Sequence, residues 1–107
     1  DPAPQDIAAV GRAAVAFEVG AGFESDWFDK AFAASGSKAK RVAVSDGLEL
    51  EGGECRHAPG RQPEPGHHHE PDPHVWHEVT NAVHMVGKVR DGLCEIDPAN
   101  AAEYRAN

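Results

Sequence analysis

The order of the apolar runs predicts an α/β fold with a small parallel sheet. Two short runs rich in β-branched and aromatic residues, Ala14–Val19 and Arg41–Ser45, have the length and composition of buried strands. Between them, residues 25–34 repeat their apolar side chains at helical spacing. A strand, a helix and a strand with short connections form a βαβ unit, whose two strands run parallel. The 107 residues therefore suit one domain, 1–107, with flanking helices and a small core.

The first helix and the first strand meet near Ala14. The segment from Asp6 to Ala14 carries apolar residues at helical spacing after a proline-containing start, which predicts a short helix with Asp6 as its N-cap. The strand that follows ends at the turn 20–22, Gly-Ala-Gly. Because this strand is mostly apolar rather than alternating, we expect cover on both of its faces.

The helix expected from Ser25 to Ala34 carries an aromatic stripe. Ser25 or Asp26 would cap its start, and Gly36 would end it. The stripe predicts packing against the sheet far more readily than a ligand site, and it consists of Trp27, Phe28, Ala31 and Phe32.

The second strand leads into a long irregular segment. The basic residues Lys38–Arg41 come just before it and are expected to form a solvated turn. Residues 46–73 are rich in glycine, proline and histidine and lack apolar periodicity, which predicts a loop. In an open α/β fold this loop would lie at the carboxyl edge of the sheet, where such folds bind ligands.

Helical spacing returns after the loop. Apolar residues recur every three or four positions and predict a helix from about Glu78 to Glu95; they are Val75, Val79, Val83, Val86, Val89 and Leu93. Asp97 followed by Pro98 then predicts a break and a restart, so that residues 98–107 begin another helix.

The charge of the chain restricts its partners. Eighteen acidic residues against ten basic ones give a net charge of -8, which repels nucleic acid and anionic membrane surfaces and suits a cationic ligand. No apolar run approaches the ~20 residues of a membrane span, and residues 1–6 lack the basic and apolar regions of a signal peptide. We expect a soluble chain.

Two cysteines, Cys55 and Cys94, are too few for a disulfide framework and too far apart for a CxxC motif. In an oxidising compartment they would be able to pair, and in a reducing one they would be separate thiols. The sequence leaves both alternatives open.

The histidines point to a metal. Four of the seven histidines fall within residues 67–74, and imidazole is the commonest metal ligand in proteins. His67, His68 and His69 would bind zinc, nickel or copper loosely, because three consecutive residues in a glycine/proline loop are not preorganised. Simple solvation is the alternative for this run. His74 follows Pro73, which fixes the backbone, and is therefore the better positioned ligand.

Other arrangements of chemistry have less support. His77 and His84 share one helix face, and Glu78 lies four residues after His74, but exposed helix histidines are usually only solvated. A metallohydrolase that uses His74, His77 and Glu78 is the weakest alternative, since it needs an open coordination position. The sequence has no GxSxG, HExxH or P-loop motif, so we expect no enzyme.

The order of the motifs resembles that of a known family. Ser45-Asp46-Gly47, a histidine-rich loop, the run DPHVW at 72–76, and DPANAAEY at 97–104 follow one another as in the metal-specific solute-binding proteins of bacterial ABC importers. The segment Pro4–Ile7 and the pair Trp27-Phe28 also fit that pattern. The likeness covers nearly the whole chain, and the histidine-rich loop is typical of zinc-type rather than manganese-type members.

The resemblance implies two α/β lobes joined by a long helix, with a metal ion between them. Of the family's ligands only the histidine of DPHxW has a match, His74; the others would lie before residue 1 and after residue 107. The chain would then be an incomplete amino-terminal lobe, with the start of the interlobe helix at 98–107. It would be a periplasmic or extracytoplasmic receptor that binds Zn(II), with Mn(II), Ni(II) or Cu(II) as alternatives, and delivers it to an ABC permease.

The main rival interpretation is a non-catalytic α/β fragment whose histidines bind metal only weakly. A sheet of two strands leaves both edges open, and open edges pair readily with other chains. This interpretation predicts a homo-oligomer formed through the sheet edges.

Overall fold

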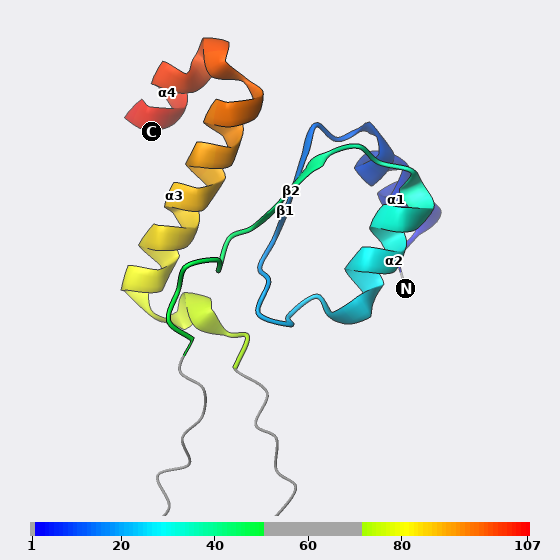
Figure 1. Cartoon of the computed structure of the whole chain (residues 1–107), viewed down its shortest axis with the longest axis horizontal. Coiled ribbons are helices and arrows are strands. Elements are labelled where there is room, and N and C mark those ends of the chain that lie inside the picture. Colours follow the sequence, from blue (N-terminus) through cyan, green and yellow to red (C-terminus); the bar gives the residue numbers. More distant parts are fainter. Residues whose placement is uncertain (1, 51–71) are drawn as a thin grey trace, which may run out of the picture.

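The computed structural model describes residues 2–50 and 72–107 and confirms the α/β prediction (Figure 1). The first part contains helix α1 (Pro4–Arg12), strand β1 (Val15–Glu18), helix α2 (Ser25–Ser35) and strand β2 (Lys40–Ala43). The second part contains the short helix η1 (Val75–His77), helix α3 (Val79–Ile96), the short helix η2 (Pro98–Asn100) and helix α4 (Ala101–Ala106). Most of the loop expected at 46–73, including His67, His68 and His69, lies outside the described residues.

The two strands pair in parallel, as the βαβ pattern predicts. Val15 is in register with Lys40 and Glu18 with Ala43. The ladder continues past the strand ends, because the Val44 N–H donates to the Glu18 carbonyl at 2.8 Å and the Ser45 N–H to the Val19 carbonyl at 3.1 Å. The carboxyl ends of both strands therefore lie side by side.

Helices lie on both sides of this small sheet (Figure 1). On one side, α3 contacts both strands, and its buried Gly92 lies against the side chains of Phe17 and Val42. On the other side, the Arg41 guanidinium of β2 lies over the ring of Phe28 in α2, 4.9 Å from its centroid. The strand residues are half-buried except Arg41, which is exposed, so the expected cover on both faces is incomplete within the described residues.

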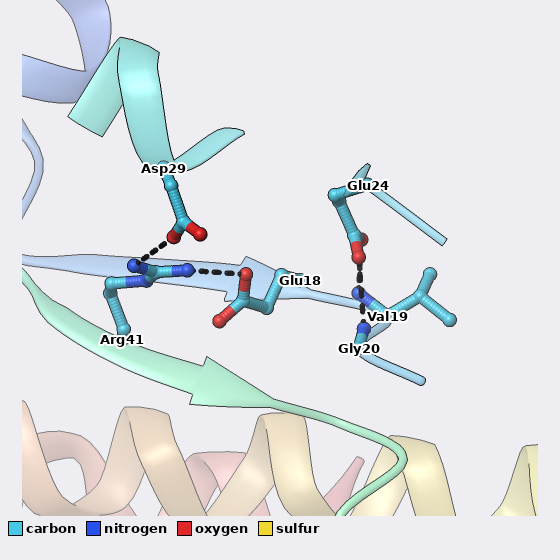
Figure 2. A network of polar contacts seen from close by, with 6 residues as sticks. All are labelled: Glu18, Val19, Gly20, Glu24, Asp29 and Arg41. Carbon is cyan, nitrogen blue, oxygen red and sulfur yellow. Dashed lines mark hydrogen bonds and ion pairs between the residues drawn. The ribbon is translucent and has the colours of Figure 1, made fainter. Parts of the chain in front are cut away.

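Two of the basic residues expected in a solvated turn, Lys40 and Arg41, instead lie in β2 and form ion pairs, although Arg41 remains exposed. Arg41 donates to Glu18 Oε2 and to Asp29 Oδ1, each at 2.7 Å, and Figure 2 shows its guanidinium between the two carboxylates. The hydrogen bond to Glu18, followed by that to Asp29, raises the pKa of Arg41. Lys40 forms an ion pair with Glu95 of α3. These side chains tie β2 to the helices on both sides.

The helix ends are set partly by residues other than those expected. Asp6 is not the N-cap of α1, because the helix begins at Pro4 and the Asp6 carboxylate accepts the Ala3 N–H at 3.0 Å from inside the first turn. Glu24 occupies the N-cap position of α2. Gly36 ends α2 as predicted, with φ of 61°, a conformation that glycine adopts without strain.

Part of the predicted core is exposed. Phe28 and Ala31 are buried, but Trp27 is 48% exposed and rests edge-to-face on Phe28, so the packing predicted for the stripe is wrong for Trp27. The valine spacing correctly predicts α3, yet three of its members are more than two-thirds exposed: Val79, Val83 and Val86. Among the described helices none is long and apolar enough to cross a membrane.

The predicted break at Asp97 and restart at Pro98 are confirmed. Asp97 ends α3, and Pro98 is the first residue of η2, which continues into α4. The Asp97 carboxylate accepts two hydrogen bonds at 2.8 Å, from the Asn100 amide and from the Tyr104 hydroxyl. One side chain thus joins the ends of two helices. An interlobe role for residues 98–107 stays a prediction.

The hydrogen bonds that the Asp97 carboxylate accepts from Asn100 and Tyr104 predict an acid-sensitive contribution to stability. Hydrogen bonds from Asn100 and then Tyr104 hold the pKa of Asp97 below 3.8. A depressed pKa means that the stabilisation is complete above about pH 5 and is lost as the pH falls through the lowered value. Thermal unfolding followed between pH 3 and 7 should show a smaller fall in Tm on acidification for Asp97→Asn than for the wild type. An equal fall in both proteins would contradict this assignment.

Candidate metal site

The best supported ligand candidate, His74, lies at the carboxyl edge of the sheet. It immediately precedes η1, and its ring contacts Phe23, which follows the carboxyl end of β1. Asp46 lies just after β2, and its carbonyl accepts a hydrogen bond from Nε2 of His84 in α3. The described residues that follow β2 and the His74 ring therefore both lie near the carboxyl edge of the sheet, the edge expected for the segment 46–73.

Asp72 orients His74. The His74 backbone N–H donates to Asp72 Oδ1 at 2.9 Å, and the same oxygen lies 2.7 Å from Nδ1 of the His74 ring. Because an ionised carboxylate only accepts, Nδ1 carries the proton in this contact. The lone pair of the neutral ring is then on Nε2. A carboxylate on one ring nitrogen and a free lone pair on the other is the usual arrangement of a metal-binding histidine.

The Asp72 carboxylate is ionised when it orients His74, because its pKa is lowered. Its pKa is lowered from 3.8, first by the hydrogen bond from the His74 backbone and then by the bond from the His74 ring. Asp72 therefore stays ionised throughout the pH range in which an imidazole titrates. Its negative charge at Nδ1 keeps the tautomer that leaves Nε2 free to bind a cation.

Aromatic rings hold the His74 ring from several directions. Trp76 lies 5.2 Å from it between centroids, and Phe23 lies 6.2 Å away at an interplanar angle of 80°. His77 is stacked on Trp76, at 25° and 5.7 Å, and its ring is 6.0 Å from that of His74. The His74 side chain remains 54% exposed, so it is both supported and accessible.

His84, in α3, does not join the cluster of rings around His74 but contacts the end of β2. Nε2 of His84 lies 2.8 Å from the Asp46 carbonyl oxygen, so His84 connects α3 to the end of β2. Residues 2–50 and 72–107 contain no group of three or more His, Cys, Asp or Glu side chains that would hold a metal ion. A metallohydrolase site of His74, His77 and Glu78 is thus not assembled in this part of the chain.

Several predicted residues cannot be placed. His67, His68 and His69 lie outside the described residues, and so does Cys55. The sulfhydryl of Cys94 lies 3.6 Å from the Ala101 carbonyl oxygen. A disulfide between the two cysteines, and the three loop histidines as ligands, therefore stay predictions.

Two supporting residues were not assigned a role from the sequence. Asp72 was recognised only as part of the DPHVW run, although an Asp two residues before a backbone N–H is a known signal for an Asx turn. Phe23 reaches the site through a contact between residues more than fifty positions apart, for which the sequence carries no local signal.

The comparisons with known proteins agree on one family. The family described as the periplasmic component A of the zinc-uptake complex, ZnuA, matches residues 1–107. The zinc-binding lipoprotein AdcA of Streptococcus pneumoniae is 38% identical over 71 residues, which are 65% of this chain and 14% of the relative. The zinc-binding protein AdcA of Streptococcus pyogenes is 35% identical over 52 residues, which are 49% of this chain and 10% of the relative.

A solved structure agrees with the fold. The crystal structure of a ZnuA deletion mutant with zinc bound superposes with a TM-score of 0.75 and 28% identity, over 99% of this chain and 36% of the other. This chain therefore spans about a third of that structure and about a seventh of the pneumococcal relative. Because the family match extends over all 107 residues, the chain belongs to the ZnuA family of periplasmic zinc-uptake components.

Proposed function

We propose that this chain supplies His74 as a zinc ligand of an extracytoplasmic receptor, which delivers Zn(II) to an ABC permease. The observation that carries the proposal is the contact of Asp72 with both the ring and the backbone of His74. A histidine that is merely solvated would not require its Nδ1 and its N–H to be held by one carboxylate. Metal-binding histidines usually donate their other ring N–H to such a carboxylate.

Zinc is the metal that the combined observations favour. Neutral imidazole suits zinc, whereas manganese prefers carboxylate and carbonyl oxygens. Two relatives are named for zinc binding and the similar crystal structure contains zinc. Copper and nickel also bind imidazole well, so selectivity against them has to come from the geometry of the complete site.

The proposed receptor is not an enzyme. One described ligand with a half-exposed ring suits capture and release, and the family is one of zinc-uptake components. His67, His68 and His69, which come shortly before His74 in the sequence, would add weak, exchangeable binding. The remaining tight ligands would come from parts of the receptor that this chain does not include.

The Asp72→Asn substitution tests the proposal. Asparagine keeps the size and one acceptor oxygen of the side chain but loses the charge, so the contact with Nδ1 weakens and the His74 ring is held less firmly. We expect zinc affinity of the full-length protein to fall about tenfold, within the 10- to 100-fold range for outer-shell partners. Competition with a chelating zinc indicator would measure the change.

Asp91→Asn is the matched control. It removes the same charge from the distant half of α3, where Asp91 pairs with its neighbour Arg90. We expect it to leave zinc affinity within a factor of about two, because an exposed charge at that distance is largely screened. If both variants lose zinc affinity equally, Asp72 acts only through the overall charge of the protein. That result would contradict the proposal that Asp72 orients His74 as a ligand.

A further inference from the structure

The connection between β1 and α2 contains an unusual turn. Gly20, Ala21 and Gly22 have φ angles of 79°, 53° and 82°, so three consecutive residues are left-handed. The Phe23 N–H closes the turn on the Gly20 carbonyl at 3.0 Å. A non-glycine residue with positive φ is costly unless its surroundings hold it, so Ala21 in particular needs support from outside the turn.

Glu24 provides this support. One oxygen of its carboxylate accepts the Val19 N–H and the other accepts the Gly20 N–H, the latter at 3.0 Å (Figure 2). Hydrogen bonds to an ionised carboxylate are roughly twice as strong as neutral ones. Glu24 occupies the N-cap position of α2, but its side chain makes no capping hydrogen bond to that helix. The carboxylate instead points back to the end of β1.

Phe23 lies between this turn and Glu24, and its ring reaches the His74 site. The ring stands edge-to-face with Trp76 at 5.0 Å and 86°, and with His74 at 6.2 Å and 80°. The backbone on both sides of Phe23 is therefore fixed by Glu24 or by the turn that Glu24 holds. A shift of this backbone would withdraw the ring from Trp76 and His74.

We propose that Glu24 is a positioning residue for zinc binding, which acts through Phe23 on the orientation of His74. This inference rests on the proposed function, in which His74 binds zinc. Asp72 holds the ring at Nδ1, and Phe23 and Trp76 restrict the directions in which it swings. Loss of the hydrogen bonds from Val19 and Gly20 to the Glu24 carboxylate leaves His74 in place but lets its ring adopt more orientations.

The test is the Glu24→Gln substitution, alone and combined with Phe23→Leu, in the full-length protein. Glutamine keeps the length of the side chain but cannot accept with both oxygens as a carboxylate does. We expect each single variant to lower zinc affinity about fivefold, less than the 10- to 100-fold loss for outer-shell partners because the effect on His74 is indirect, and the double variant to lower it no further. Glu103→Gln in α4 has the same charge change and should leave affinity unchanged.

A spectroscopic readout separates positioning from general stability. The His74 ring protons lie within the ring-current fields of Phe23 and Trp76, so their NMR shifts in the zinc-free folded protein should move in Glu24→Gln in the same direction as in Phe23→Leu. Unchanged His74 shifts, or losses of affinity that add in the double variant, would overturn the inference.

The two proposals fail in different ways. If His74→Ala leaves zinc affinity unchanged, the proposed function is wrong, whatever the Glu24 variants do. If His74→Ala abolishes tight binding while Glu24→Gln only lowers the unfolding temperature, the receptor proposal stands and the positioning role is wrong.

Discussion

Replacing His74 by alanine should remove tight zinc binding from the receptor. The loss should exceed about 100-fold, because removal of a direct ligand costs more than the 10- to 100-fold lost with an outer-shell partner. Asp72 would then hold only a backbone N–H and would lose its hydrogen bond to an imidazole ring. Competition titration of the full-length protein with a zinc indicator measures the change.

The loop histidines supply the comparison for this variant. Replacing His67, His68 and His69 together by alanine removes three imidazoles, against one in His74→Ala. We expect the triple variant to keep the tight site and to lose only weakly bound zinc, because adjacent loop residues are not preorganised for tetrahedral coordination. If the triple variant loses tight binding and His74→Ala does not, the ligand assignment is reversed.

The fold could be predicted from the sequence where local patterns decide it. The apolar runs predict β1 and β2, the spacing of Phe28 and Ala31 predicts α2, and Asp97-Pro98 predicts the break before α4. In each case the residues that signal the element lie within it or next to it. The predicted bounds differ from the observed ones by two residues or fewer, as for α1, which starts at Pro4 rather than Asp6.

The site could be predicted only in part, because its supporting contacts join distant segments. His74 is recognisable from its place after Pro73 and from the family motif. The Phe23 contact depends on how β1 and η1 come together in three dimensions. Lys40 and Arg41 were expected to be solvated for the same reason, since their carboxylate partners, Glu95 among them, lie on other elements.

The exposed valines show a limit of periodicity as a signal. Spacing of three and four residues predicts that a helix has an apolar face, but not which neighbour covers it. Within the described residues, α3 contacts the sheet through Gly92, while Val83 and Val86 are each 68% exposed. A glycine has no side chain to contribute to an apolar pattern. The spacing of apolar residues therefore gives no signal for Gly92, the residue through which α3 packs on the sheet.

Substitution of Gly92 by leucine should cause a large loss of stability. A Cβ on Gly92 would lie 2.9 Å from Cε1 of Phe17 and 3.4 Å from Cγ2 of Val42, both closer than or at the limit of ordinary contact. Phe17 and Val42 are paired across the sheet, so moving one disturbs the other. Overpacking of this kind costs about 2–3 kcal/mol, which urea unfolding of the full-length protein would measure as a lower midpoint.

Gly87 provides the matched control in the same helix. A Cβ on Gly87 would meet no described atom within 4 Å, so Gly87→Ala should stabilise the protein by about 0.5–1 kcal/mol through helix propensity alone. Gly92→Ala gains the same propensity but pushes the Phe17 ring away, so its effect should be opposite in sign to that of Gly87→Ala. If both alanine variants are stabilised equally, α3 does not pack on the sheet through Gly92. The opposite signs would instead show that close approach of α3 to β1 and β2 requires a residue without a side chain at this position.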